Sequence, residues 1–156
     1  MSASQVLRQA LEATATGDTD AIRSLYADDL DGWSAGQRIR TRDELIAEAA
    51  ARGAAFSGVR LHADPADLAD GRVAAEWRLE ARHTGELRLD DGFDVPPTGR
   101  AIDLRGALFA EVRDGRITAF RQYWDQAELL EQLGLLGNDP TGAGAGAGSG
   151  GREVPA

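Results

Sequence analysis

Hydrophobic positions at helical spacing predict three helices in the first third of the chain. The apolar positions are Val6, Leu7, Ala10 and Leu11 in the first, Ile22, Leu25 and Tyr26 in the second, and Leu45, Ile46 and Ala49 in the third. Gly17 separates the first two helices, and the letters TRDE at 41–44 have the spacing of a capping box that opens the third, which we expect to end near Gly53. The turn-rich stretch 28–39 has room for one or two short strands.

The hydrophobic period changes from helical to alternating after about residue 59. The clearest alternation has Val73, Ala75, Trp77, Leu79, Ala81 and His83 on one face and Glu76, Arg78, Glu80 and Arg82 on the other. This pattern is typical of a half-buried antiparallel strand. Similar alternation predicts strands over 59–67, 101–112 and 116–124, and Asp114-Gly115 predicts a hairpin turn between the last two.

The last periodic segment predicts a short amphipathic helix. It carries Leu129, Leu130 and Leu133 and stops at Gly134. Residues 137–156 are rich in glycine and alanine and predict a flexible tail, so residues 1–136 form the expected domain. Helices followed by strands indicate an α+β fold, with N-terminal helices packed on a curved antiparallel sheet and a cone-shaped cavity between them.

Composition narrows the classes of function. The formal net charge of −9 argues against a nucleic-acid partner. The chain lacks cysteine, and all 17 basic residues are arginine, which excludes thiolate metal sites and Schiff-base lysine chemistry. No signal peptide or membrane-length apolar run is visible, so we expect a cytoplasmic protein without a membrane partner. The two histidines lack metal-site spacing, so no metal site is expected.

Four stretches of the sequence resemble one known family. They are TGDTDAIRSLYADD at 16–29, HTGEL at 83–87, PPTGRAIDLRG at 96–106 and DGRITAFRQYWDQAELLEQLGLL at 114–136. Together they resemble the SnoaL-like polyketide and ester cyclases of the nuclear-transport-factor-2-like superfamily, over residues 4 to 136. The resemblance implies a cone-shaped α+β barrel and a cofactor-free enzyme. The implied reaction is an intramolecular aldol-type ring closure, or an ester cyclisation, of a small hydrophobic polyketide-like substrate.

Asp125 is the principal candidate for the catalytic residue. It follows Tyr123 and Trp124 directly and precedes the predicted C-terminal helix. The resemblance implies that it is the general acid/base of the reaction. Burial beside apolar rings would raise the pKa of a carboxyl group and suit it to that role. The alternative from the residues alone is that Asp125 is the N-cap of the helix, where aspartate is common.

His83 is the second catalytic candidate. It continues the apolar face of its strand, so it should point inward and hydrogen-bond the substrate or orient Asp125. The alternative is a strand-end histidine bonded to a loop, while His62 should lie near a surface turn. We expect the substrate pocket to be lined by Trp33, Trp77, Leu79, Tyr123 and Leu108.

Two other functions and one assembly follow from the same residues. An isomerase or epoxide hydrolase would need a second carboxylate in the pocket, and Asp103 is the nearest candidate. A non-catalytic binding module would have Asp125 as an exposed cap. In the last two strands both faces carry apolar residues, with Ile117 and Tyr123 on one and Phe120 and Trp124 on the other. A sheet covered on both sides predicts a homodimer through its outer face.

Overall fold

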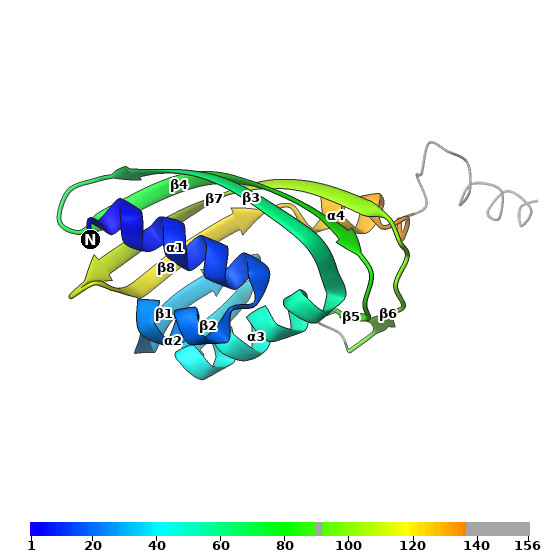
Figure 1. The fold of residues 1–156 in the computed structure, drawn as a ribbon, viewed down its shortest axis with the longest axis horizontal. Coiled ribbons are helices and arrows are strands. Elements are labelled where there is room, and N and C mark those ends of the chain that lie inside the picture. Colours follow the sequence, from blue (N-terminus) through cyan, green and yellow to red (C-terminus); the bar gives the residue numbers. More distant parts are fainter. Residues whose placement is uncertain (90–91, 137–156) are drawn as a thin grey trace, which may run out of the picture.

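The computed structural model describes residues 1–89 and 92–136, and the predicted tail at 137–156 lies outside the described residues. The elements, in chain order, are α1 (Ala3–Thr16), α2 (Thr19–Leu25), β1 (Tyr26–Ser34), β2 (Gln37–Thr41), α3 (Arg42–Ala55), β3 (Phe56–Asp67), β4 (Arg72–His83), β5 (Leu87–Arg88), β6 (Asp94–Val95), β7 (Ala101–Arg113), β8 (Arg116–Trp124) and α4 (Gln126–Gln132) (Figure 1). The α+β fold is confirmed. No helix in these described ranges is both long and apolar enough to cross a bilayer.

Capping side chains begin the helices where the sequence indicates. Ser2 and Gln5 form a capping box that satisfies backbone donors at the start of α1, and Gly17 ends this helix with a φ of 78°. Thr41 caps α3 by accepting a hydrogen bond from the Glu44 amide at 3.1 Å. The predicted end of α3 near Gly53 is wrong, because the helix continues to Ala55.

The stretch predicted to be turn-rich folds into a full hairpin. It forms the nine residues of β1 and the five of β2, joined through Ala35 and Gly36, which have φ values of 47° and 88°. Positive φ at both central residues is the requirement of a tight hairpin turn. The sequence AG at 35–36 is a weaker signal than the DG at 114–115, whose predicted turn is confirmed.

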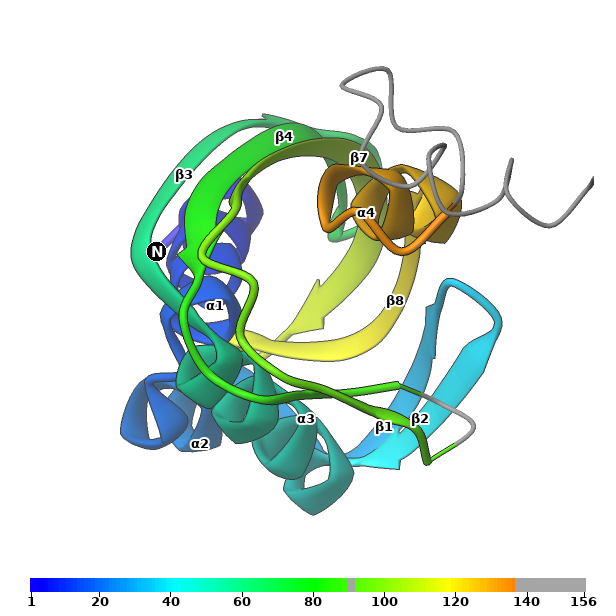
Figure 2. The same ribbon diagram turned by 90° about the vertical axis from the view of Figure 1, so that its right-hand side faces the viewer.

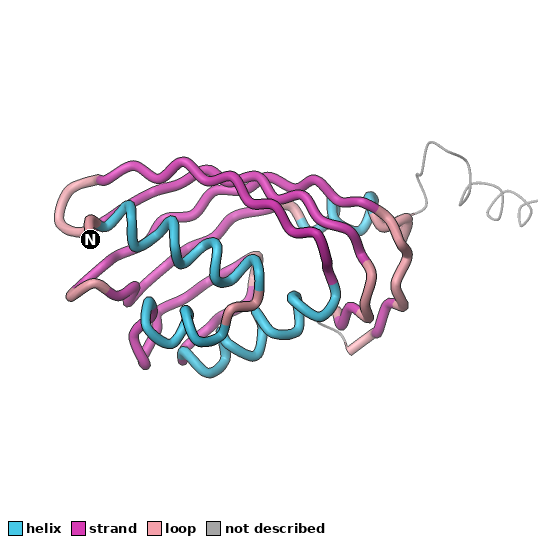
Figure 3. Tube along the Cα trace, in the orientation of Figure 1, coloured by secondary structure: helices cyan, strands magenta, loops and turns pink. Residues whose placement is uncertain are grey.

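One curved sheet of six strands forms the body of the molecule, in the order β2-β1-β8-β7-β4-β3. Its neighbours are antiparallel except for β1 and β8, which pair in parallel, so the sheet is mixed rather than wholly antiparallel as predicted. Figure 2 shows the sheet curving round from β3 to β1 and β2, with α1 and α3 along its inner side. Figure 3 shows the short α4 after the end of β8, alongside the first part of β7.

A register shift decides which residues of β8 face inward. The shift lies between Glu111 and Val112 of β7, so Ile117 and Phe120 both reach the core, with 1% and 5% exposure. The predicted division of these two residues between opposite faces is therefore wrong. Tyr123 does lie on the outer face, where it is exposed.

Two hydrophobic clusters cover the inner face of the sheet from its two ends. The first joins α1, α2 and α3 to the sheet through residues such as Leu7, Ile22 and Ile117. The second joins Ile102 and Leu104 of β7 to α4 and to the β5–β6 pair. Trp77 of β4 is half-buried and packs against both clusters. The space between the clusters is the site described below.

Two glycines near the end of α3 should respond oppositely to alanine. A Cβ at Gly85 would overlap the carbonyl oxygen of Ala54, whereas a Cβ at Gly53 would come no nearer than 3.4 Å to other atoms. We expect Gly85→Ala to lower the free energy of unfolding by about 1–3 kcal/mol, as overpacking does. Gly53→Ala should raise the free energy of unfolding by about 0.5–1 kcal/mol, because alanine loses less conformational entropy than glycine when the helix forms. Urea denaturation measures both, and equal effects of the two changes would contradict this packing.

Candidate functional site

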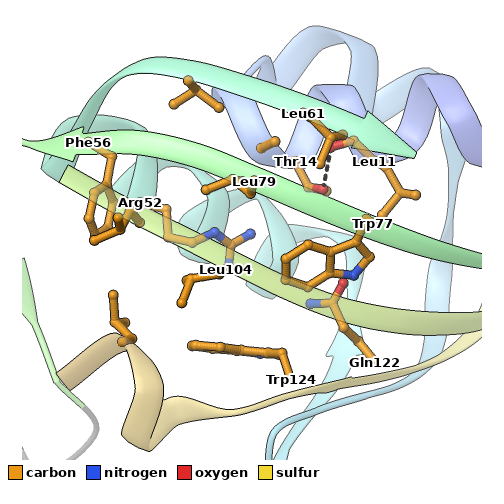
Figure 4. A pocket seen from close by; sticks show the side chains of 14 residues that line it. Leu11, Thr14, Arg52, Phe56, Leu61, Trp77, Leu79, Leu104, Gln122 and Trp124 are labelled. Atoms are coloured by element: carbon orange, nitrogen blue, oxygen red, sulfur yellow. Dashed lines mark hydrogen bonds between the residues drawn. The ribbon is translucent and has the colours of Figure 1, made fainter. Parts of the chain in front are cut away.

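A partly open cavity of about 110 Å³ lies between the helices and the inner face of the sheet (Figure 4). Its apolar lining consists of Leu11, Ala15, Phe56, Val59, Leu61, Trp77, Leu79, Ile102, Leu104, Trp124 and Leu129. Three polar residues complete the lining, Thr14 of α1, Arg52 of α3 and Gln122 of β8. We call this space the inner chamber.

Arg52 is the charged residue of the inner chamber. Figure 4 shows its side chain extending along the cavity in the direction of Trp77. Arg52 is exposed, because its side chain faces the open space of the chamber and not packed side chains. Its guanidinium forms no ion pair or hydrogen bond with any other described residue. Its guanidinium donors are therefore open to whatever occupies the chamber.

Burial lowers the pKa of the Arg52 guanidinium, while the charges of Glu48 and Tyr26 act in the opposite direction. Burial also raises the pKa of Tyr26, against weaker effects of Arg52 and of the Thr14 hydroxyl. An arginine keeps its proton even so. The inner chamber therefore holds a positive charge among mostly apolar side chains.

A wider space of about 350 Å³ shares Arg52, Phe56, Trp124 and Leu129 with the inner chamber, and we call it the mouth. Glu48 of α3 lies in its wall, and Gln37 of β2 donates a hydrogen bond of 2.9 Å to its Oε1. Glu48 and Arg52 are one helical turn apart, and both face this space. The mouth is thus more polar than the chamber behind it.

The predicted pocket residues fall into three places. Trp77 and Leu79 line the inner chamber. Leu108 is buried in the first hydrophobic cluster, so it supports the sheet and does not border the cavity. Trp33 and Tyr123 lie on the outer face, with ring centres 5.0 Å apart, because the alternation of β1 and β8 points them away from the helices.

Asp125 is the N-cap of α4. Its Oδ1 accepts hydrogen bonds from the amides of Ala127 at 2.9 Å and Glu128 at 3.3 Å. The residue is exposed and is absent from the walls of the chamber and mouth, although its neighbours Trp124 and Gln126 line the mouth. No described donor binds its Oδ2. The structure thus shows the capping geometry, and a role of Asp125 in catalysis stays a prediction.

His83 is fully buried beside Phe56, outside the cavity wall. Its Nδ1 accepts a hydrogen bond from the Thr98 amide at 3.2 Å and lies 3.0 Å from the Thr98 hydroxyl. The ring proton therefore belongs on Nε2, which has no hydrogen-bond partner that meets normal geometry in the described structure. In this position His83 contacts neither Asp125 nor a ligand of the chamber.

The HTG and PPTG motifs form one structural unit around His83. The amides of Thr84 and Gly85 both donate to the carbonyl of Ala55, at 3.0 and 2.9 Å, which satisfies the last turn of α3. The Gly99 amide donates to the carbonyl of His83 at 2.8 Å. These motifs therefore fasten the end of β4 to α3 and to the segment that leads into β7.

The remaining polar candidates lie on the outer face. Arg78 binds both carboxylate oxygens of Asp103, at 2.8 and 2.7 Å, and this pairing lowers the pKa of Asp103. Asp103 faces solvent, which removes it as the second carboxylate that an isomerase or epoxide hydrolase would need. Arg121 similarly pairs with Asp31. His62 is exposed as expected, but it lies within β3 and not in a turn.

Sequence reasoning missed the polar residues of the cavity, among them Arg52, Glu48 and Gln122. A signal for Arg52 was present, since it follows Leu45 and Ala49 at positions i+7 and i+3 on the buried face of α3. Gln122 similarly lies between Phe120 and Trp124 in the inward phase of β8. Among residues 1–89 and 92–136, no three histidine, aspartate or glutamate side chains gather as a metal site would require.

Comparisons with family models and with solved structures point to the same family. The model of the SnoaL-like polyketide cyclase family matches residues 4–133. Comparison with curated proteins gives no match.

Solved structures with the same fold include several proteins of the same description. A candidate polyketide cyclase from Pseudomonas putida has a TM-score of 0.71 at 22% identity, covering 85% of this chain and 98% of its own. Another from Xanthomonas campestris has a TM-score of 0.71 at 25% identity, covering 84% and 96%. An NTF2-like protein of unknown function from Burkholderia pseudomallei has a TM-score of 0.65 at 19% identity, covering 85% and 98%.

The buried His83 should make stability depend on pH. Burial lowers its pKa in the folded protein, against a weaker effect of the Gly85 backbone. The unfolded chain therefore takes up the proton first, as the pH falls below about 6.5. The contribution of this neutral histidine is complete above that pH and is lost as the pH falls toward the lowered folded-state value.

Urea denaturation at pH 7.5 and 5.5 measures this loss. In His83→Asn the side-chain oxygen can still accept a hydrogen bond from the Thr98 amide. We expect the free energy of unfolding of this variant to fall less between pH 7.5 and pH 5.5 than that of the wild type. The matched control His62→Asn changes an exposed histidine and should keep the wild-type pH dependence. An identical pH dependence in His83→Asn and the wild type would show that His83 is not the titrating group.

Proposed function

Because the chain belongs to the SnoaL-like polyketide cyclase family, we propose that it closes a ring in a small apolar carbonyl compound by cofactor-free acid/base chemistry. The observation that carries this proposal is the inner chamber, a partly open and mostly apolar space with three polar residues, Thr14, Arg52 and Gln122, in its wall. Such a site binds an apolar molecule, fixes its fold and excludes water.

The proposed reaction proceeds in three steps. A carboxylate base removes a proton from the carbon next to a carbonyl group, and the electron pair of the C–H bond moves into an enolate. The enolate carbon attacks a second carbonyl of the same molecule, which forms a carbon–carbon bond and an alkoxide. The carboxylic acid then returns the proton to the alkoxide oxygen. The chamber contributes by holding the two reacting carbons together.

Asp125 is the proposed base, on the resemblance of its surroundings to the family motif. The support from its position is that Trp124 and Gln126 on either side of it line the mouth. Its Oδ1 holds the start of α4, while Oδ2 has no described partner. One carboxylate can in this way cap the helix and accept a proton, once a substrate reaches the mouth.

Glu48 is a second candidate for the base, favoured by its place in the wall of the mouth. A non-catalytic small-molecule-binding module is the second candidate function. The observation in its favour is that Asp125 is exposed and capping, as such a module would have it. A measurement of proton abstraction distinguishes these possibilities without a known natural substrate.

Exchange of carbon-bound hydrogen for deuterium is the test. We expect the protein to accelerate exchange next to the carbonyl of 4-phenyl-2-butanone in D₂O above the buffer rate, followed by ¹H NMR. Asp125→Asn should lower the enzymatic rate by about 100-fold or more, as loss of a general base does. Asparagine caps helices as well as aspartate, so the melting temperature should change little.

Two matched variants complete this experiment. Glu76→Gln alters an exposed carboxylate of β4 and should leave exchange unchanged. Glu48→Gln tests the second base, and loss of exchange there with full activity in Asp125→Asn would transfer the role to Glu48. Exchange at the buffer rate with the wild-type protein, while the ketone still binds, would contradict the enzymatic proposal and favour the binding module.

We also propose a homodimer through the outer face of the sheet. The support is a row of aromatic rings on that face, contributed by Trp33, Tyr123 and Phe109 from three neighbouring strands. Phe109 and Tyr123 are each 51% exposed in the single chain. Contiguous apolar surface of this kind is typical of protein interfaces.

Light scattering after size exclusion should give twice the mass of one chain. We expect Phe109→Arg to shift the protein to monomer, because it places a charge within the aromatic row. The control Leu135→Arg changes an exposed residue beyond α4 and should leave the dimer intact. A monomeric wild-type protein at micromolar concentration would contradict this assembly.

A further inference from the structure

The inner chamber has a positive charge without a matching negative one. Arg52 is the charged member of its lining, and neither aspartate nor glutamate is among the other lining residues. The five N–H donors of its guanidinium meet no acceptor among the described residues. A guanidinium that faces a mostly apolar space without a protein acceptor can bind an anionic group, so this arrangement indicates a ligand that supplies the partner.

The nearest carboxylate is engaged elsewhere. Glu48 influences Arg52 through its charge but forms no ion pair with it. Gln37 donates to Glu48 across the mouth, which directs that carboxylate toward β2. Arg52 therefore keeps its donors turned to the space between the hydrophobic clusters.

Other polar groups of the wall leave this charge unbalanced. The Thr14 hydroxyl donates to the Leu11 carbonyl at 3.1 Å, and the Gln122 amide donates to Ser34 at 3.2 Å. Trp77 Nε1 is buried without a hydrogen-bond partner among the described residues, so it is a further unused donor. The wall thus offers more donors than acceptors to a ligand.

We propose that the cavity takes a ligand with an apolar body and a planar pair of oxygens that carries one negative charge, of which a carboxylate is the simplest. Arg52 binds the two oxygens side by side, as guanidinium groups bind carboxylates. The apolar body lies against the leucines and tryptophans of the inner chamber. This inference rests on the proposed use of the cavity as the substrate site but is independent of the chemistry that follows.

Binding of two ligands of matched size tests the charge requirement. Octanoate and octanamide have the same chain and similar shape, but only octanoate is an anion at pH 7.5. We expect calorimetry to give octanoate at least about tenfold higher affinity, the factor typical of a hydrogen-bonded charge. Equal affinities, or a preference for octanamide, would overturn the proposal.

Three arginine variants locate the anion. Arg52→Met keeps the length of the side chain without its charge, and it should abolish the preference for octanoate while octanamide still binds. Arg60→Met changes a residue with a 73% exposed side chain on β3 and should keep the preference. Arg88 lies at the mouth in an ion pair with Asp94, so loss of the preference in Arg88→Met alone would place the anion there and overturn the role of Arg52.

Thermal stability separates a ligand-binding arginine from a structural one. Without ligand, Arg52→Met should melt at a higher temperature than the wild type, because it removes an uncompensated charge. Octanoate should raise the melting temperature of the wild type and not that of the variant. A lower melting temperature of Arg52→Met together with unchanged octanoate affinity would show that the residue is structural. If the protein did not accelerate deuterium exchange in 4-phenyl-2-butanone, the proposed reaction would be contradicted. The binding results with octanoate and octanamide would be unaffected.

Discussion

The cavity exists because two separate hydrophobic clusters cover the inner face of one curved sheet. The helices at one end and α4 with the β5–β6 pair at the other bury most of their apolar residues in separate clusters, although Ala55 at the end of α3 belongs to the second cluster. Trp77 lies at the junction, and its indole rests over Gly106, where a Cβ would overlap the ring. Protein interiors are otherwise closely packed. We therefore attribute this gap to the course of the backbone and not to loose packing of side chains. Every feature of the site follows from that division.

The motifs that carry the family resemblance serve mainly to hold this division in place. His83 and Thr98 are joined by a buried hydrogen bond, and Gly85 lets the chain approach the end of α3. Asp125 fixes the start of α4. Of the polar residues that face the cavity, Gln122 lies in the last of those motifs, whereas Arg52, Thr14 and Glu48 lie outside them. A family can in this way share a scaffold while its members differ in what the cavity accepts.

Patterns within one element predicted most of the fold. The alternation in β4, the turn at Asp114-Gly115 and the stop at Gly17 all depend on neighbouring residues, and the structure agrees with each. The parallel pairing of β1 with β8 was not predictable, because it joins segments about 90 residues apart in the sequence. The register shift in β7 likewise moved Ile117 to the core. For the site, periodicity placed Trp77 and Leu79 correctly, but only the packing of α3 against the sheet shows that Arg52 has no partner.

The place of β8 in the sheet determines when the sheet can form during synthesis of the chain. This last strand lies between β1 and β7, so it joins the β1–β2 hairpin to the strands that follow α3. Until residues 116–124 have left the ribosome, the two halves of the sheet have no backbone bonds to each other, and the apolar faces of the helices stay partly uncovered. Long-range pairing of this kind slows folding and exposes strand edges. The nascent chain therefore completes its sheet only after residues 116–124 have emerged, and truncation before Arg116 would leave two unjoined parts of the sheet.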